Sequence, residues 1–138
     1  MTNLGVMYQN GSGVEQSFGK ALEWYRKAAV QNNAAALHNL GLMYQNGDGV
    51  VLNYLQAIKW YEKAAAQNYA DSQNSIGEMF YAGHGVVKNY SKAIEWYEKA
   101  AAQDHAGAQN NLGWMHQNGL GVEKNYASAV EWFEKAAA

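Results

Sequence analysis

The sequence contains no cysteine and no proline among its 138 residues. Without cysteine the chain cannot form disulfides, thiolate zinc sites or a cysteine nucleophile, and its redox compartment stays open. Proline is tolerated least in the interior of helices, so its absence is compatible with an all-helical chain. The formal net charge is only −2 at pH 7, which gives no reason to expect nucleic acid as a partner.

The sequence also lacks a long apolar run. No stretch approaches the roughly 20 apolar residues that a membrane span needs, so we predict no membrane insertion. The first ten residues, MTNLGVMYQN, have neither the basic start nor the apolar centre of a signal peptide. The localisation is therefore unknown from the sequence. Because 49% of the residues are hydrophobic, we expect a substantial core within a single domain over residues 1–138.

Two sequence blocks recur along the chain at a step of 36 residues. The first block reads LGVMYQNGSGV from Leu4, LGLMYQNGDGV from Leu40, IGEMFYAGHGV from Ile76 and LGWMHQNGLGV from Leu112. The second block reads ALEWYRKAA from Ala21, AIKWYEKAA from Ala57, AIEWYEKAA from Ala93 and AVEWFEKAA from Ala129. The chain is therefore four copies of one unit, at about residues 1–33 (truncated), 34–69, 70–105 and 106–138.

Each copy predicts two helices, which we name helix A and helix B. In the second copy apolar residues from Leu37 to Tyr44 follow the i, i+3, i+4, i+7 spacing of one helical face. Gly47 then ends helix A, because glycine readily adopts the left-handed conformation of a helix end. Asn53 is placed to cap helix B. The equivalent capping positions in the other copies are Ser17, Asn89 and Asn125.

A glycine recurs inside every helix A, at Gly5, Gly41, Gly77 and Gly113. Glycine costs about 1 kcal/mol relative to alanine in a helix interior. Four occurrences at the same position therefore predict close packing of a neighbouring helix. We expect the tryptophans of helix B to make this contact, namely Trp24, Trp60, Trp96 and Trp132.

The pattern LG.MY..G.GV followed by A..WY.KAA resembles the Sel1-like repeat family, relatives of the tetratricopeptide repeats, over essentially the whole chain. The resemblance implies an all-α, right-handed superhelical solenoid of antiparallel helix pairs. It also implies a non-enzymatic scaffold or adaptor that holds proteins together. Two departures are mild: asparagine replaces the usual aspartate before helix B, and His116 replaces the tyrosine of LG.MY in the last copy.

Positions that differ between the copies lie on one face of helix A, at spacings of 3, 4 and 3 residues. In the tetratricopeptide relatives this face lines a concave groove, and the resemblance carries the groove to this chain. A face that combines Leu42, Tyr81 and Trp114 with polar residues predicts a protein or peptide partner. The predicted groove residues are Val6, Gln9, Ala35, His38, Leu42, Gln45, Asp71, Asn74, Glu78, Tyr81, Gly107, Asn110, Trp114 and Gln117.

No motif predicts a cofactor or a metal ion. The Gly-x-Gly-Val segments lack the preceding strand and the lysine of a phosphate loop, so we interpret them as helix ends and turns. The histidines are His38, His84, His105 and His116, and none pair at i, i+4. We expect His38 on the ligand-facing surface or in solvent, and His116 in packing.

Two alternative functions stay open. The run from Ser17 to Lys20 matches the S-x-x-K motif of penicillin-interacting enzymes, and cysteine-rich relatives in the Sel1-like group have been linked to β-lactam binding. A β-lactam-binding or hydrolysing enzyme is therefore one alternative, although the capping position of Ser17 favours a structural role. Because neither end of the array carries a polar capping helix, we expect either a fragment of a longer array or a homo-oligomer. A purely self-assembling array is the other alternative.

Overall fold

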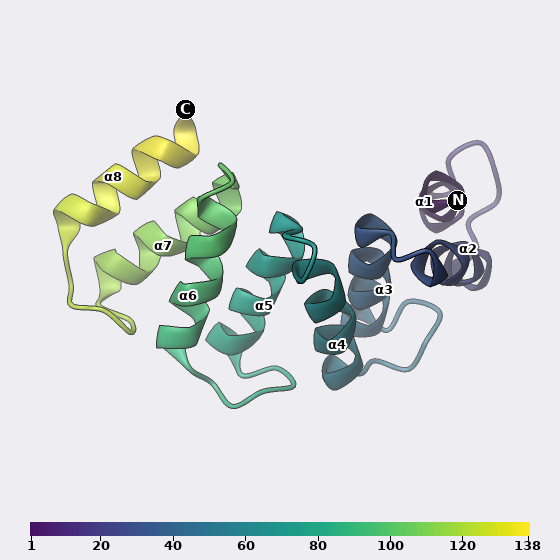
Figure 1. Ribbon diagram of the computed structural model, residues 1–138, viewed down its shortest axis with the longest axis horizontal. Coiled ribbons are helices and arrows are strands. Elements are labelled where there is room, and N and C mark those ends of the chain that lie inside the picture. Colours follow the sequence, from purple (N-terminus) through teal and green to yellow (C-terminus); the bar gives the residue numbers. More distant parts are fainter. The chain divides into compact units, whose positions relative to one another are not determined.

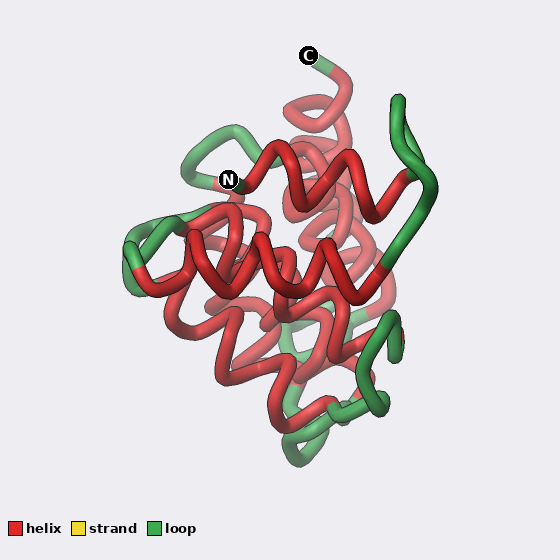
Figure 2. Tube along the Cα trace, turned by 90° about the vertical axis from the view of Figure 1, so that its right-hand side faces the viewer, coloured by secondary structure: helices red, strands yellow, loops and turns green.

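The computed structural model describes residues 1–138 and consists of eight α-helices joined by loops, with no strand (Figures 1 and 2). The all-α prediction is confirmed. No helix combines the length and the apolar composition that crossing a membrane would require. The helices are α1 (Thr2–Asn10), α2 (Phe18–Val30), α3 (Ala34–Asn46), α4 (Tyr54–Ala65), α5 (Ala70–Ala82), α6 (Tyr90–Ala101), α7 (Ala106–Asn118) and α8 (Tyr126–Ala137).

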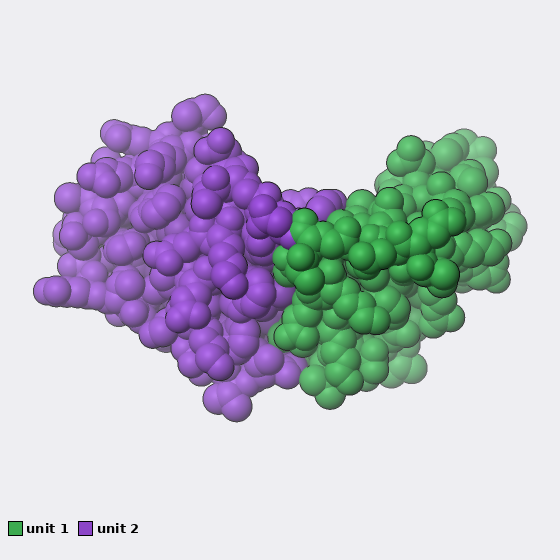
Figure 3. Space-filling model, viewed as in Figure 1, with its two compact units in different colours: residues 1–67 green, residues 68–138 purple.

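The chain forms two compact units, residues 1–67 and residues 68–138, which we call unit 1 and unit 2 (Figure 3). Each unit contains two helix pairs, α1/α2 and α3/α4 in unit 1, and α5/α6 and α7/α8 in unit 2. The two pairs of a unit are joined by packing of a helix B on the next helix A, α2 on α3 and α6 on α7. Each helix is thus held by its hairpin partner, and α2, α3, α6 and α7 also by a second neighbour.

Helix B begins with a side-chain cap in every copy. The Asn53 side chain accepts a hydrogen bond from the backbone N–H of Gln56, over 3.0 Å. Ser17, Asn89 and Asn125 do the same at the starts of α2, α6 and α8. The capping prediction is therefore confirmed. Such a cap stabilises a helix by about 1 kcal/mol because it satisfies a backbone donor that has no partner within the helix.

The Gly-x-Gly loops are turns. Gly47 ends α3 at φ 74°, and Gly49 has φ 71°, a conformation that side chains other than glycine seldom adopt. A Cβ on Gly49 would lie 2.8 Å from Cβ of Phe18, at the start of α2. The second glycine of this loop thus lets the loop pack on the preceding helix B. Backbone geometry and packing explain the motif without a phosphate.

The glycine inside helix A contacts an aromatic ring, but the ring is not tryptophan. A Cβ on Gly41 would lie less than 3.0 Å from ring atoms of Tyr61. The same relation joins Gly5 to Tyr25, Gly77 to Tyr97 and Gly113 to Phe133. The prediction of tryptophan was wrong because the residue one position later, rotated by about 100° around the helix, is the one that faces helix A.

The tryptophans instead lie half-buried beneath lysine side chains. The Nζ atom of Lys63 is 4.6 Å from the ring centroid of Trp60, and Lys99 approaches Trp96 to 4.0 Å. Lys27 and Lys135 cover Trp24 and Trp132 in the same way. A lysine over an indole ring is a favourable cation–π contact that also shields apolar surface from water.

The repeated tyrosine crosses the core of its helix pair. In unit 1 Tyr25 is fully buried with Ala21, Leu22, Leu40 and Met43. In unit 2 the equivalent Tyr97 is buried in a cluster completed by Ala93, Ile94, Ala100, Ala101, Ala108, Leu112 and Met115. Because each ring packs on the glycine of helix A, its hydroxyl group emerges near the variable face of that helix. The fold thereby brings a polar atom to the predicted groove.

Candidate functional site

In unit 1 the tyrosine hydroxyl groups are occupied by glutamines of the variable face. Tyr25 donates a hydrogen bond to Oε1 of Gln9 over 2.6 Å, and Tyr61 donates to Oε1 of Gln45. His38 is buried, with its ring centroid 5.3 Å from that of Tyr61, so the expectation that it lies in solvent was wrong. In unit 1, Gln9, Gln45 and His38 therefore all contribute to packing around the repeated tyrosine.

The other predicted groove residues differ in exposure. Val6, Asp71, Glu78, Gly107, Asn110, Trp114 and Gln117 are exposed. Ala35, Leu42 and Tyr81 are half-buried, whereas Asn74 is buried. The largest exposed apolar side chain among them is that of Trp114, which is 50% exposed. Trp114 is therefore the residue of this face best placed to contribute apolar area to a partner.

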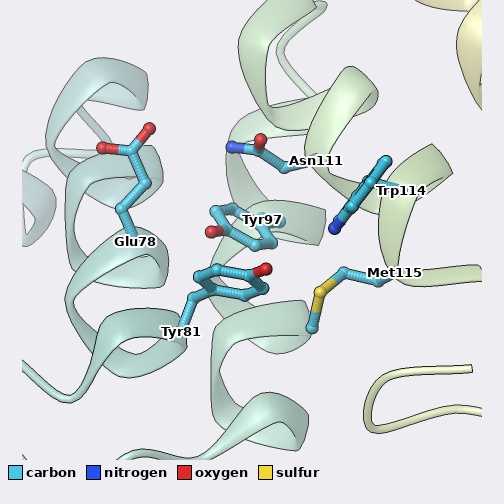
Figure 4. A pocket seen from close by; sticks show the side chains of 6 residues that line it. All are labelled: Glu78, Tyr81, Tyr97, Asn111, Trp114 and Met115. Atoms are coloured by element: carbon cyan, nitrogen blue, oxygen red, sulfur yellow. The ribbon is translucent and has the colours of Figure 1, made fainter. Parts of the chain in front are cut away.

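A cavity of about 310 Å³ lies in unit 2 between α5, α6 and α7. We call it the aromatic pocket; Figure 4 shows the rings of Tyr81 and Tyr97 between Glu78 and Trp114. It is lined by Glu78, Tyr81, Tyr97, Asn111, Trp114 and Met115. The sequence predicted Glu78, Tyr81 and Trp114 as groove residues, and the structure brings these three together.

Sequence reasoning missed the other three lining residues. Tyr97 and Met115 belong to positions that recur among the copies, so comparison of the copies assigns them to the scaffold alone. Nothing in the sequence shows that the tip of a core tyrosine reaches the variable face. Asn111 is one residue away from the predicted Asn110, which is exposed and does not line the cavity. Asn111 would have been predicted only if the variable face of helix A had been defined as one residue wider.

One wall of the aromatic pocket carries a tyrosine where other copies have glutamine. Tyr81 occupies the position that Gln9 and Gln45 occupy in the first two copies. Its ring packs against Tyr90 with a centroid distance of 5.5 Å, and the Tyr97 hydroxyl has no glutamine to accept its hydrogen bond. Burial raises the pKa of Tyr97, as do the negative charge of Glu78 and the neighbouring Tyr81. Tyr97 therefore presents a neutral hydroxyl group to the pocket.

Glu78 supplies a carboxylate held by amides. Nδ2 of Asn74 donates to Oε1 of Glu78 over 3.1 Å, and Nδ2 of Asn111 donates to Oδ1 of Asn74 over 3.1 Å. Burial raises the pKa of Glu78, while hydrogen bonds from Asn74 and Asn111 and the nearby His105 oppose this rise. The pocket thus contains a carboxylate that forms no salt bridge with a lysine or arginine of the chain.

A histidine fixes the start of α7 relative to α5. Nδ1 of His105 accepts a hydrogen bond from the backbone N–H of Ala108 over 3.0 Å, so the proton of the neutral ring lies on Nε2. Nε2 then donates to Oδ1 of Asp71 over 2.8 Å. Because this bridge joins the two helices that carry Glu78 and Trp114, it helps to hold the walls of the aromatic pocket apart at a defined distance.

The S-x-x-K segment has a structural role. Oγ of Ser17 accepts from the backbone N–H of Lys20 over 3.2 Å as the cap of α2. The Lys20 ammonium group lies over the ring of Tyr8, 5.2 Å from its centroid. A serine nucleophile needs a base within hydrogen-bond reach, and no such contact joins the two side chains. No cluster of three or more histidine, aspartate or glutamate side chains is placed to bind a metal ion either.

Comparison with known proteins agrees with this architecture. The family model described as Sel1 repeat matches residues 1–33, 34–69, 70–105 and 106–138. No curated protein matches the chain. Among solved structures, c5321, a protective antigen present in uropathogenic Escherichia coli strains with an SLR fold, superposes with a TM-score of 0.92 at 42% identity. A Sel1 repeat protein from Oxalobacter formigenes gives a TM-score of 0.93 at 40% identity.

This chain corresponds to only part of the length of these two proteins. Each superposition covers 99% of this chain, but only 29% of c5321 and 56% of the Oxalobacter protein. Cysteine rich protein B of Helicobacter pylori matches 92% of this chain over 91% of its own length, with a TM-score of 0.68 at 28% identity. The neighbours confirm the all-α repeat solenoid.

Proposed function

The chain belongs to the Sel1 repeat family, and we propose that it is a non-enzymatic scaffold that binds a protein or peptide segment on the helix A face of its repeats. Sel1 repeat proteins are generally scaffolds for protein interaction. The partner contact is assigned to unit 2, along α5 and α7, because the aromatic pocket lies there.

One observation carries the proposal: Trp114 is half exposed at the edge of a cavity that also contains Tyr81 and Glu78. Burial of an indole ring by a partner removes a large apolar area from water at little cost in side-chain entropy. Tryptophan and tyrosine are also the residues that most often dominate binding energy in interfaces. In unit 1 the same face offers only Val6, Ala35 and Leu42 as apolar contacts, and none of them is aromatic.

The test is a selection of peptides from a displayed random library with the intact chain, followed by affinity measurements on the enriched peptides. Trp114→Ala should weaken their binding at least about tenfold, because truncation of a central aromatic anchor commonly costs 2 kcal/mol or more. Its melting temperature should stay nearly unchanged, since the ring is half exposed. Tyr126→Ala is the matched control, because Tyr126 is an exposed aromatic residue (61%) outside the pocket.

Two results would overturn the assignment. If Trp114→Ala binds the selected peptides as well as the original chain does, the partner contacts another surface. If Trp114→Ala unfolds the chain, the ring belongs to the core and the exposed face has been misassigned. Circular dichroism and thermal melts of both variants separate these outcomes.

A further inference from the structure

The aromatic pocket combines two features that together select a class of ligand. Three aromatic rings, those of Tyr81, Tyr97 and Trp114, line it, and the Glu78 carboxylate stands at its wall. Aromatic faces attract cations through the negative potential above the ring, and a carboxylate attracts them directly. A neutral apolar side chain would use the rings, but it would leave the carboxylate desolvated without compensation.

We propose that the aromatic pocket binds one arginine side chain of the partner segment, with its guanidinium group between the aromatic rings and the Glu78 carboxylate. The inference rests on the proposed binding of a peptide or protein segment and names the residue that this segment inserts. It assigns Glu78 as the residue that determines specificity, and Tyr81 and Trp114 as the residues that supply the stacking surfaces.

The choice of arginine follows from the shape and the acceptors of the pocket. A guanidinium group is planar, stacks on aromatic rings and carries five N–H donors, whereas a lysine ammonium group is a compact and strongly hydrated charge. The acceptors available to these donors are the Glu78 carboxylate, the hydroxyl groups of Tyr81 and Tyr97 and the side-chain carbonyl of Asn111. The volume of about 310 Å³ also leaves room for the planar group together with part of its aliphatic stem.

The charge of unit 2 favours the same ligand. Unit 2 carries eight acidic side chains and five lysines, whereas unit 1 carries four acidic and five basic side chains. Lys99 and Lys135 lie over Trp96 and Trp132 and form no salt bridge with Glu78. The carboxylate of the pocket is thus not neutralised by the chain itself. A cationic ligand would also offset the cost of burying this charge.

The experiment uses three blocked tripeptides with the full chain: acetyl-glycyl-arginyl-glycinamide and its lysine and citrulline counterparts. Citrulline has nearly the shape of arginine but no charge. Binding is followed by the indole N–H resonance of Trp114, which is assigned by its disappearance in Trp114→Phe. We expect a saturable shift with the arginine peptide, and an affinity at least about tenfold lower with citrulline because the charge-assisted contact is lost. Lysine should bind between the two.

Two variants test the role of the carboxylate. Glu78→Gln keeps the side-chain volume and an oxygen that can accept from Asn74, but removes the charge. It should lower the affinity for the arginine peptide about tenfold and abolish the preference over citrulline. Glu95→Gln is the matched control, because Glu95 is an exposed residue of α6 outside the pocket and its loss changes the net charge equally. It should leave both affinities unchanged.

Several outcomes would overturn the inference. They are a Trp114 resonance that none of the peptides moves, equal binding of arginine and citrulline, and a Glu78→Gln variant that keeps the preference. Lysine binding as tight as arginine would overturn the choice of a guanidinium group. Failure here remains distinguishable from failure of the scaffold function. Library peptides that depend on Trp114 but not on arginine would preserve the scaffold function alone.

Discussion

Unit 1 and unit 2 share one scaffold and differ in the residue that meets the tip of the repeated tyrosine. In unit 1 Gln45 accepts the hydrogen bond of Tyr61, and Gln9 does the same for Tyr25. In unit 2 the equivalent position is Tyr81, and the Tyr97 hydroxyl opens into the aromatic pocket. Substitutions at a few variable positions can therefore line a cavity in this scaffold, because three of the four copies already bring a buried tyrosine hydroxyl group close to the variable face.

The same substitution changes the chemistry of the face. In unit 1 a glutamine accepts the hydrogen bond of the buried tyrosine hydroxyl group and leaves a polar surface. A tyrosine removes that acceptor and adds a ring, and Trp114 supplies another across the cavity. Unit 2 also gains a carboxylate at Glu78, where the second copy has Leu42. Equivalent substitutions in the two units can therefore be compared directly, and residues of one unit can be introduced into the other.

The strongest destabilisation should follow from substitution of the helix A glycine, which packs on a tyrosine ring in both units. Gly41→Ala in unit 1 and Gly77→Ala in unit 2 should each destabilise the chain by about 2 kcal/mol or more, since the added Cβ would overlap a tyrosine ring. Helix propensity alone predicts the opposite sign by about 1 kcal/mol. Urea unfolding measures the difference. Gly19→Ala is the control, because a Cβ there meets nothing closer than Oγ of Ser17 at 3.9 Å; it should stabilise.

A smaller effect should separate the two units. Tyr61→Phe should cost about 1–2 kcal/mol, because Gln45 loses its donor in a half-buried site. Tyr97→Phe should change stability by less than about 0.5 kcal/mol, since its hydroxyl faces the pocket and has no glutamine partner. Equal costs for the two substitutions, measured by urea unfolding, would contradict the difference that we draw between the units.

The glutamine of unit 1 can be introduced into unit 2 to test whether it accounts for the difference in the cost of the tyrosine-to-phenylalanine substitutions. Tyr81→Gln should give the Tyr97 hydroxyl an acceptor, so that Tyr97→Phe becomes costly in that background. A double-mutant cycle should then show a coupling of about 1 kcal/mol between positions 81 and 97. If the coupling is absent, the glutamine does not reach the hydroxyl group, and the pocket depends on more than one substitution.

The smallest effect concerns the cap of α2. Ser17→Ala should destabilise the chain by about 1 kcal/mol, and Ser17→Asn, the residue found at this position in the other copies, should be nearly neutral.

Labelled penicillin should form no covalent adduct with the chain, because the Lys20 ammonium group lies over Tyr8 and does not contact the Ser17 hydroxyl group. An adduct on Ser17, identified by mass spectrometry, would favour the β-lactam alternative over the scaffold.

Much of this architecture could be predicted from the sequence, because the repeat supplies four observations of each position. The helix ends at Gly47 and Asn53 follow from the chemistry of left-handed glycine and of side-chain capping, which are local effects. The identity of the ring against Gly41 was predicted wrongly. Trp60 and Tyr61 are adjacent in sequence, both are aromatic, and both recur, so the sequence offers no reason to prefer the tyrosine.

The candidate site could be predicted only in part, because comparison of the copies finds positions that vary but not scaffold positions that also line the cavity. Variation among the copies identifies Glu78, Tyr81 and Trp114, since these residues depart from the repeat. It also identifies His38, which the structure buries beside Tyr61. It conceals Tyr97, because a conserved scaffold position and a pocket wall look the same when a single side chain serves as both.

Local spacing and backbone preference are enough to predict the repeat, the helix pairs, their caps and turns, and the face of helix A that varies. Three further facts become visible only in the folded chain: which ring packs on the helix A glycine, where the tyrosine hydroxyl group emerges, and that Glu78, Tyr97 and Trp114 share one cavity. Those facts depend on the rotation and distance between packed helices, and side-chain packing sets both across residues that are far apart in the chain.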